Sequence, residues 1–182
     1  MVRIAFYGKS GVGKSTSTSF AKEYFKEKNM SVDVIKLAYP LYEIQEMFYK
    51  VAGKDIDFYD QNQSLLEDIA DNLRKINSNS LVDYFDRRLK QTKSQVVIND
   101  DVRDTKNDFP YLKKAGFKLI RIECDEQLRI RRLQERNDLN MVVNSKTTQD
   151  IDSVEPDHVI NTSTTTLEEL KQNVYNYLES IC

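Results

Sequence analysis

The residues best suited to chemistry form a glycine-rich run near the start of the chain. Residues 8–15 read Gly-Lys-Ser-Gly-Val-Gly-Lys-Ser and fill the pattern G-x-x-x-x-G-K-S/T. An apolar run, Val2–Tyr7, comes directly before them, and apolar residues at positions 20, 21, 24 and 25 recur behind them at helical spacing. A strand that turns through glycines into a helix directs successive N–H groups, and the positive end of the helix dipole, at one anion. The sequence therefore predicts a phosphate-binding loop (P-loop), the alternative being an ordinary turn whose glycines meet only steric needs.

Two side chains at the end of this run can act on a bound nucleotide. We expect the Lys14 ammonium to reach the terminal phosphates of a nucleoside triphosphate. The Ser15 hydroxyl is expected to ligate Mg2+. The loop alone thus predicts that the chain binds a triphosphate, and it leaves the reaction open.

Length and charge narrow the class of protein. The 182 residues, of which 40% are hydrophobic and 31% charged, predict one globular domain spanning residues 1–182. A net charge of −2 argues against a protein that holds nucleic acid through bulk positive charge. No apolar run approaches ~18 residues, so no membrane association is expected. Two cysteines without metal-like spacing favour a reducing cytoplasm, and a monomer or homodimer is expected.

Elements that alternate along the chain must position these groups. Helical periodicity fills the gaps between five β-rich runs, which are Val2–Tyr7, Val32–Leu37, Gln95–Asn99, Lys118–Glu123 and His158–Asn161. Alternating strands and helices predict an α/β, three-layer fold, a five-stranded parallel sheet with helices on both faces. Ligands of such sheets bind beyond the carboxyl ends of the strands.

Two segments interrupt the simple alternation. Residues 38–94 hold three predicted helices where one crossover helix would do, and this insertion can house a second substrate. Residues 137–153 are polar and can act as a mobile lid. Surface elaboration is the alternative for each segment.

Acidic residues follow the central strand of the chain. Asp100 and Asp101 come directly after the apolar run that ends at Asn99, and Arg103 follows two positions later. We expect Asp100, and after it Asp101, to hold Mg2+ or to orient the attacking oxygen. Arg103 is expected to bind a phosphate of the acceptor. Capping of the next helix by the acids, and a solvated arginine, are the alternatives.

A cluster of arginines leads into the predicted lid. Arg132 and Arg136 are four residues apart on one helical face, where guanidinium groups can meet the charge that develops in phosphoryl transfer. Arg129 and Arg131 are expected to face solvent. The alternative for the whole cluster is a charged, exposed helix face.

The pattern as a whole resembles the nucleoside monophosphate kinase group. More narrowly it is similar to the bacteriophage and bacterial deoxynucleoside monophosphate kinases and to dephospho-CoA kinase. Beside the P-loop, the resemblance is carried by residues 37–41, 99–103, 116–122, 157–161 and 167–170 and by the pair Arg132 and Arg136.

The resemblance implies a P-loop kinase fold that transfers the γ-phosphate of ATP to a nucleotide. ATP and Mg2+ are then the cofactors. Asp100, Asp101 and Arg103 would serve the metal and the acceptor, and Arg132 and Arg136 would close over the phosphates. The donor nucleotide would be bound by Gly11, Val12, Gly13, Lys14, Ser15 and Thr16.

One departure from these relatives concerns the acceptor side. The relatives usually carry an acid before the proline that follows the second strand and a lysine shortly after it, whereas this chain has Tyr39 and Tyr42 around Pro40. A missing charge pair should change what binds there. Tyr39 and Tyr42 are expected to contact the substrate by stacking on a base, and Arg74 is a further candidate for its phosphate.

The sequence therefore predicts an ATP-dependent phosphotransferase that converts a (deoxy)nucleoside monophosphate into the diphosphate. Its partner is a small-molecule nucleotide acceptor, and no nucleic acid is expected. One alternative is a P-loop kinase for a non-nucleotide acceptor, for dephospho-CoA or for a modified base in DNA. A second alternative is a switch protein that hydrolyses ATP.

Overall fold

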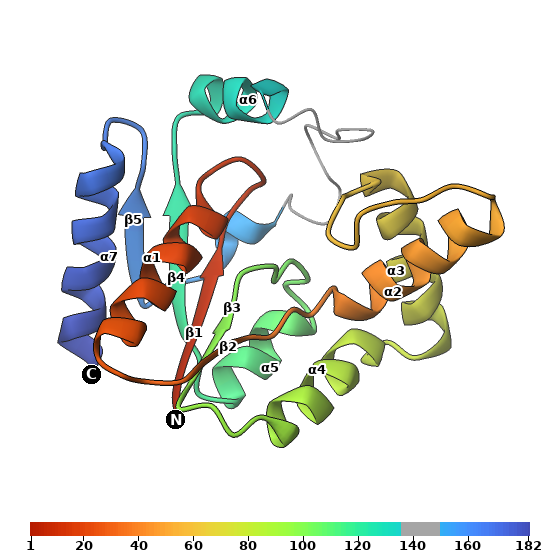
Figure 1. Ribbon diagram of the computed structural model, residues 1–182, viewed down its shortest axis with the longest axis horizontal. Helices are drawn as coiled ribbons and strands as arrows, with labels where there is room; N and C mark the ends of the chain where they lie inside the picture. The colour runs from red at the N-terminus through yellow and green to blue at the C-terminus, as the bar shows by residue number, and fades with distance from the viewer. Residues whose placement is uncertain (136–149) are drawn as a thin grey trace.

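The computed structural model describes residues 1–135 and 150–182. Its strands are β1 (Val2–Tyr7), β2 (Val32–Val34), β3 (Val96–Asn99), β4 (Lys118–Glu123) and β5 (His158–Asn161). They form a five-stranded sheet in the order β2-β3-β1-β4-β5, and the pairings among the described residues are parallel (Figure 1). The carboxyl ends of the strands therefore meet at one edge of the sheet, with β1 at its centre.

Helices occupy the connections that the apolar periodicity predicts. They are α1 (Lys14–Glu27), α2 (Tyr39–Val51), α3 (Gln63–Ile76), α4 (Ser80–Gln91), α5 (Asp108–Lys114), α6 (Glu126–Glu135) and α7 (Leu167–Ile181), with a short 3-10 helix, η2 (Ile151–Ser153). Among the described residues, no helix is long and apolar enough to cross a bilayer.

The two faces of the sheet carry two separate apolar cores. Ile4 and Phe6 of β1 belong to the cluster that packs on α1 and α7, whereas Ala5 and Tyr7 belong to the cluster that packs on α4 and α5. This alternation is the period of two that a strand imposes on its side chains. The expected α/β fold, with helices on both faces of a parallel sheet, is confirmed.

The second strand is shorter than the sequence predicts. The apolar run Val32–Leu37 suggested six residues, but β2 ends at Val34. Ile35 still donates a hydrogen bond to Ile98 of β3 at 2.9 Å. Beyond it the N–H groups of Leu37 and Ala38 donate to the Asp101 carboxylate and not to a neighbouring strand, so the β-ladder ends there.

The segment 38–94 forms its own apolar cluster beside the sheet. Leu41 of α2 packs with Leu66 and Ile69 of α3 and with Leu81 of α4. Figure 1 shows α2 and α3 to the right of the sheet, away from α1 and α7. Helix α4 joins the two parts, because its Phe85 belongs to the core under the sheet.

A buried carboxylate holds the loop between β3 and α5. Asp108 is 3% exposed and accepts hydrogen bonds from the N–H groups of Arg103 (3.3 Å) and Asp104 (3.0 Å). Burial raises the pKa of Asp108 to about 6. The folded chain therefore binds more protons than the unfolded chain between about pH 4 and 6, and this carboxyl lowers stability as the pH rises through that window.

We predict that Asp108→Asn removes this pH dependence while an amide oxygen keeps the two hydrogen bonds. The free energy of unfolding of the variant minus that of the wild type should rise by about 2 kcal/mol from pH 4 to pH 7. Urea denaturation at four pH values measures it. Asp71→Asn, on the exposed surface of α3, is the control. A difference for Asp108→Asn that does not change with pH would contradict the argument.

Candidate functional site

The P-loop requires glycine both for its backbone and for its packing. Gly8, Gly11 and Gly13 have φ values of 138°, 88° and 108°, a region that residues with a side chain rarely adopt. A Cβ atom on Gly8 would lie 2.2 Å from the carbonyl oxygen of Ile122, and one on Gly11 would lie 2.9 Å from that of Arg129. The loop is therefore seated directly on β4 and α6, and its conformation is fixed before any ligand binds.

The inner side of this loop has the donors that a phosphate chain needs. Lys14 Nζ donates hydrogen bonds to the carbonyl oxygens of Gly8 and Lys9, both at 2.9 Å, so its ammonium lies against the loop. Gly13 is the N-cap of α1 and places no side chain on the first turn of that helix. The uncapped N–H groups and the positive end of the helix dipole then face an anion.

The predicted nucleotide-binding residues lie together in this cradle. Gly11, Val12 and Gly13 form the loop, and Lys14, Ser15 and Thr16 form the first turn of α1. Ser15 is exposed at the start of the helix, as a metal-binding hydroxyl must be. These donors fit a triphosphate with Mg2+, an ion that takes one or two protein oxygens beside those of the phosphates.

Arg129 contradicts the expectation that it faces solvent. The residue is 2% exposed, and its Nε and a terminal nitrogen donate to the Glu126 carboxylate at 2.8 and 2.6 Å. Another terminal nitrogen donates to the carbonyl oxygen of Ser10 at 3.2 Å. Glu126, three residues earlier on α6, neutralises the charge, so burial against the P-loop is tolerated. This i, i+3 pair was the signal available in the sequence.

Arg132 lies beside the P-loop, on the side where it was expected. Its guanidinium donates to the hydroxyl of Thr162 at 3.0 Å and to the carbonyl oxygen of the same residue at 3.2 Å. The Thr162 hydroxyl in turn donates to the carbonyl oxygen of Val12 at 2.9 Å. Helix α6, the end of β5 and the loop are thus linked. Arg136 and residues 137–149 of the predicted lid lie outside the described residues.

The two acids after β3 have different surroundings. The Asp101 carboxylate accepts three hydrogen bonds from within the protein. The donors are the N–H groups of Leu37 and Ala38, both at 2.9 Å, and Asn99 Nδ2 at 2.7 Å. Burial raises the pKa of the Asp101 carboxyl, and the nearby Lys36 ammonium opposes this rise. The catalytic role expected for Asp101 stays a prediction, and its contacts are those of a residue that positions the start of α2.

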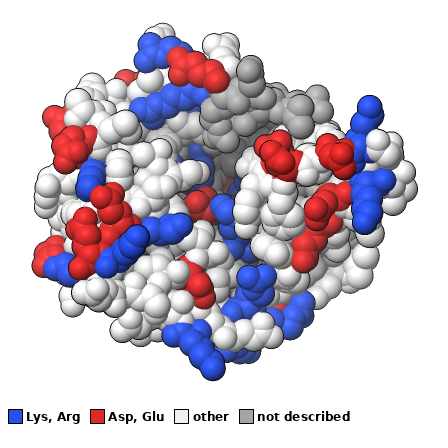
Figure 2. Space-filling model, in the orientation of Figure 1, with Lys and Arg blue, Asp and Glu red and all other residues white. Residues whose placement is uncertain are grey.

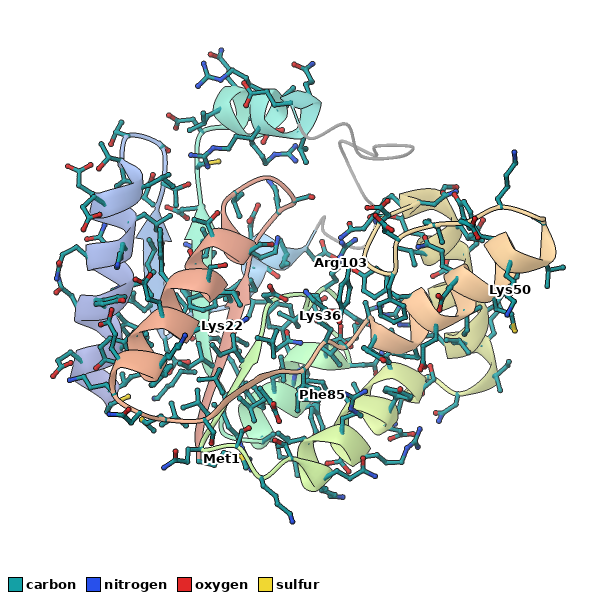
Figure 3. All side chains as sticks on the ribbon, in the orientation of Figure 1. Met1, Lys22, Lys36, Lys50, Phe85 and Arg103 are labelled. Atoms are coloured by element: carbon teal, nitrogen blue, oxygen red, sulfur yellow. The ribbon has the colours of Figure 1, made fainter. Side chains whose placement is uncertain are left out.

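Asp100 instead meets a cation that the sequence did not single out. Lys36 Nζ lies 2.6 Å from Oδ1 of Asp100, whose side chain is 6% exposed. The same ammonium lies 5.8 Å from the ring centroid of Tyr59. Figure 3 shows Lys36 and Arg103 between α1 and α2. The signal that was missed is a lysine between the second strand and Pro40.

The predicted acceptor arginines come from two elements. Arg103 follows β3, and Arg74 of α3 lies 3.3 Å from a carboxylate oxygen of Asp104 through its Nε. This ion pair ties α3 to the loop that carries Arg103. Figure 2 shows a hollow between the sheet half and the helical half of the molecule, with basic and acidic side chains on its floor.

Aromatic side chains form one wall of the insertion, and of the two predicted tyrosines Tyr42 is buried and Tyr39 is half-buried. Tyr42 is 3% exposed, and burial raises its pKa to about 12. Tyr39 stacks on Tyr84 at 6.1 Å between centroids and is covered by Arg88 at 4.7 Å. Tyr59 packs edge-on against Tyr42 at 5.4 Å and is 55% exposed. Tyr59 is therefore the most exposed of these rings, and it was not among the residues predicted from the sequence.

A separate cavity of about 350 Å³ lies on the opposite side of the P-loop from Lys36. It is lined by the ends of β4 and β5, and Lys9 and Asp152 at its rim form an ion pair at 2.9 Å. Neither Lys14 nor Asp100 lines it. This cavity therefore does not contain the lysine and the acid that the sequence predicts as catalytic.

Solved structures share this fold across nearly the whole chain. The Thermus thermophilus protein TT1252 superimposes with a TM-score of 0.58 at 14% identity, covering 100% of this chain and 98% of its own. Shikimate kinase from Bacteroides thetaiotaomicron gives 0.53 at 16% identity, and the Mycobacterium tuberculosis APS kinase CysC, in complex with AMPPNP and APS, gives 0.52 at 15%. Each of these two covers 98% of both chains. No protein-family model and no curated protein sequence matches the chain. The likeness establishes the fold of the P-loop kinases.

Proposed function

We propose that this chain is an ATP-dependent phosphotransferase whose acceptor is a (deoxy)nucleoside monophosphate. The observation that carries the proposal is the pairing of two half-sites at adjacent strands. The cradle around Lys14 follows β1. Asp100 and Arg103 follow β3, and Lys36 contacts Asp100 from the segment after β2. Neighbouring parallel strands present their carboxyl ends together, so a donor and an acceptor would meet between them.

The donor half supplies binding and charge stabilisation. The glycine backbone and the first turn of α1 would hold the phosphates, and Lys14 would leave the carbonyl oxygens of Gly8 and Lys9 for the terminal phosphate. Mg2+, held by the Ser15 hydroxyl and by Asp100 directly or through water, would supply the neutralising charge. Arg132 needs only to exchange its contacts with Thr162 for a phosphate oxygen. No covalent intermediate is required.

The acceptor half offers cations and an aromatic ring. Lys36, Arg103 and Arg74 can meet a phosphate, and Tyr59 lies 5.8 Å from Lys36 Nζ, where it can stack on a base. A nucleotide has both an anionic and an aromatic part. This combination supports a nucleoside monophosphate as the acceptor.

A P-loop kinase for another acceptor is the second candidate. It is favoured by Tyr39 and Tyr42, because they stand on either side of Pro40 where similar nucleotide kinases usually carry an acid and a lysine. One structural neighbour is a shikimate kinase. Dephospho-CoA, a modified base in DNA and an ATP-hydrolysing switch are weaker candidates, the last because both halves of a two-substrate site are present.

The test is a coupled assay of ADP release with dTMP, dGMP, dCMP, UMP, AMP, dephospho-CoA and shikimate. We expect at least one nucleoside monophosphate to stimulate release and to appear as its diphosphate. Stimulation by dephospho-CoA or shikimate alone would favour the second candidate. Release that none of these compounds stimulates would remove the monophosphate proposal.

Replacement of Lys14 should abolish transfer. In Lys14→Ala the terminal phosphate loses its cation, and we expect kcat/KM to fall by about a hundredfold or more. Lys22→Ala, on the exposed surface of α1, is the matched control and should behave as wild type. Substantial phosphoryl transfer by Lys14→Ala would refute the assignment of the donor site.

Replacement of Tyr59 should affect the acceptor only. We expect Tyr59→Ala to raise KM for the nucleotide acceptor about tenfold, because stacking of a base on an aromatic ring contributes about 1–3 kcal/mol. Tyr59→Phe keeps the ring and should keep the KM. Steady-state kinetics with ATP saturating provides the measurement. An increase in KM for ATP in place of that for the acceptor would show that Tyr59 lies on the donor side.

A further inference from the structure

The ion pair between Lys36 and Asp100 stands between the two half-sites. The nitrogen and the carboxylate oxygen are 2.6 Å apart, the Asp100 side chain is 6% exposed, and that of Lys36 is 23% exposed. Asp100 is thus the more buried member of the pair. The attraction within such an ion pair is strong when water is excluded. Removing one partner is destabilising, because the other is left as an uncompensated buried charge.

The backbone of Lys36 is held in place by the neighbouring acid. Asp101 accepts the N–H groups of the next two residues, Leu37 and Ala38, at 2.9 Å each. The main chain cannot then carry Lys36 away from Asp100, and only the flexible side chain can move. The ion pair with Asp100, at 2.6 Å, is therefore the contact that holds the ammonium of Lys36.

A divalent cation at Asp100 would conflict with this arrangement. Under the proposed function Asp100 holds Mg2+, and the positive charge of the metal would repel an ammonium bound to the same carboxylate. The displaced ammonium then needs another anion. The ring of Tyr59 lies 5.8 Å from this ammonium, and Figure 3 shows Arg103, like Lys36, between α1 and α2.

We infer that Lys36 is a specificity residue that couples the acceptor to the metal. Its ammonium holds Asp100 until an anionic group of the acceptor, a phosphate monoester, takes the place of that carboxylate. Asp100 is then released to the metal of the donor half. This inference rests on the proposed function. It would explain how the site limits hydrolysis of ATP when no acceptor is bound.

The coupling is tested with Lys36→Met, which keeps the length of the side chain and removes its charge. Lys36→Arg keeps the charge, and Lys22→Met on α1 is the matched control (Figure 3). Thermal unfolding and the affinity for ATP in EDTA verify that each variant is folded. Should Lys36→Met not fold, Lys36→Arg carries the test, because a longer, forked cation should alter the KM of the acceptor without altering that of ATP.

The first measurement concerns the metal and needs no turnover. The ratio of the Kd for ATP in EDTA to the Kd for ATP with Mn2+ reports how much the metal contributes to binding. We expect Lys36→Met to raise this ratio about tenfold, because Asp100 no longer has to break an ion pair with Lys36 before it binds the metal. Lys36→Arg and Lys22→Met should match the wild type. An unchanged or lower ratio in Lys36→Met would overturn the inference.

The second measurement concerns the acceptor. In Lys36→Met we expect KM for the acceptor to rise about tenfold and ADP release without acceptor to rise several-fold, whereas a merely structural role would change neither selectively. Unchanged values for both would overturn the coupling. If the wild type uses no monophosphate at all, the proposed function fails, and the metal ratio still decides whether Lys36 blocks Asp100.

Discussion

The arrangement of the site depends on the hydrogen bonds that the Asp101 carboxylate accepts from Leu37 and Ala38. Each is 2.9 Å long, and Asp101 is half-buried. An anion withdrawn from water is stable only when donors surround it, so the segment after β2 must stay against the tip of β3. This contact ends β2 early, fixes where α2 begins, and places Lys36 over Asp100. With the ion pair between Arg74 and Asp104, this contact attaches the helical segment to the tip of β3.

The donor half is constrained by packing in a different way. Gly8 lies so close to the carbonyl oxygen of Ile122 that a Cβ atom would approach it to 2.2 Å, and Arg129 binds the carbonyl oxygen of Ser10 from α6. The loop is held by backbone atoms on both sides, so it needs no ligand to adopt its shape. Preorganised N–H groups of this kind lose little entropy when a phosphate binds.

The parts that could be predicted from the sequence are those encoded by local patterns. Strand and helix periodicity, and the eight-residue P-loop, are contained within short windows, and the sheet with its two layers of helices followed from them. The pairing of Lys36 with Asp100 joins residues 64 positions apart. The burial of Arg129 depends on a contact 119 positions away, and the exposure of Tyr59 depends on how Tyr42 packs beneath it. Such facts arise from tertiary packing and leave no periodic trace.

The same distinction explains why the fold identifies the donor better than the acceptor. All P-loops must meet the same phosphate chain, so the geometry around Lys14 is set by one ligand and is written in a short motif. Under the proposed function the acceptor would be met by side chains from the loop after β2, the loop before α3 and the loop after β3. No single short motif contains these three segments. In this chain they converge on a cation, Lys36, that is already neutralised by Asp100. Under the proposed function, a neutral acceptor would offer nothing to replace that carboxylate, whereas a phosphate monoester would. The ion pair between Lys36 and Asp100 would then be the feature that most restricts the acceptor.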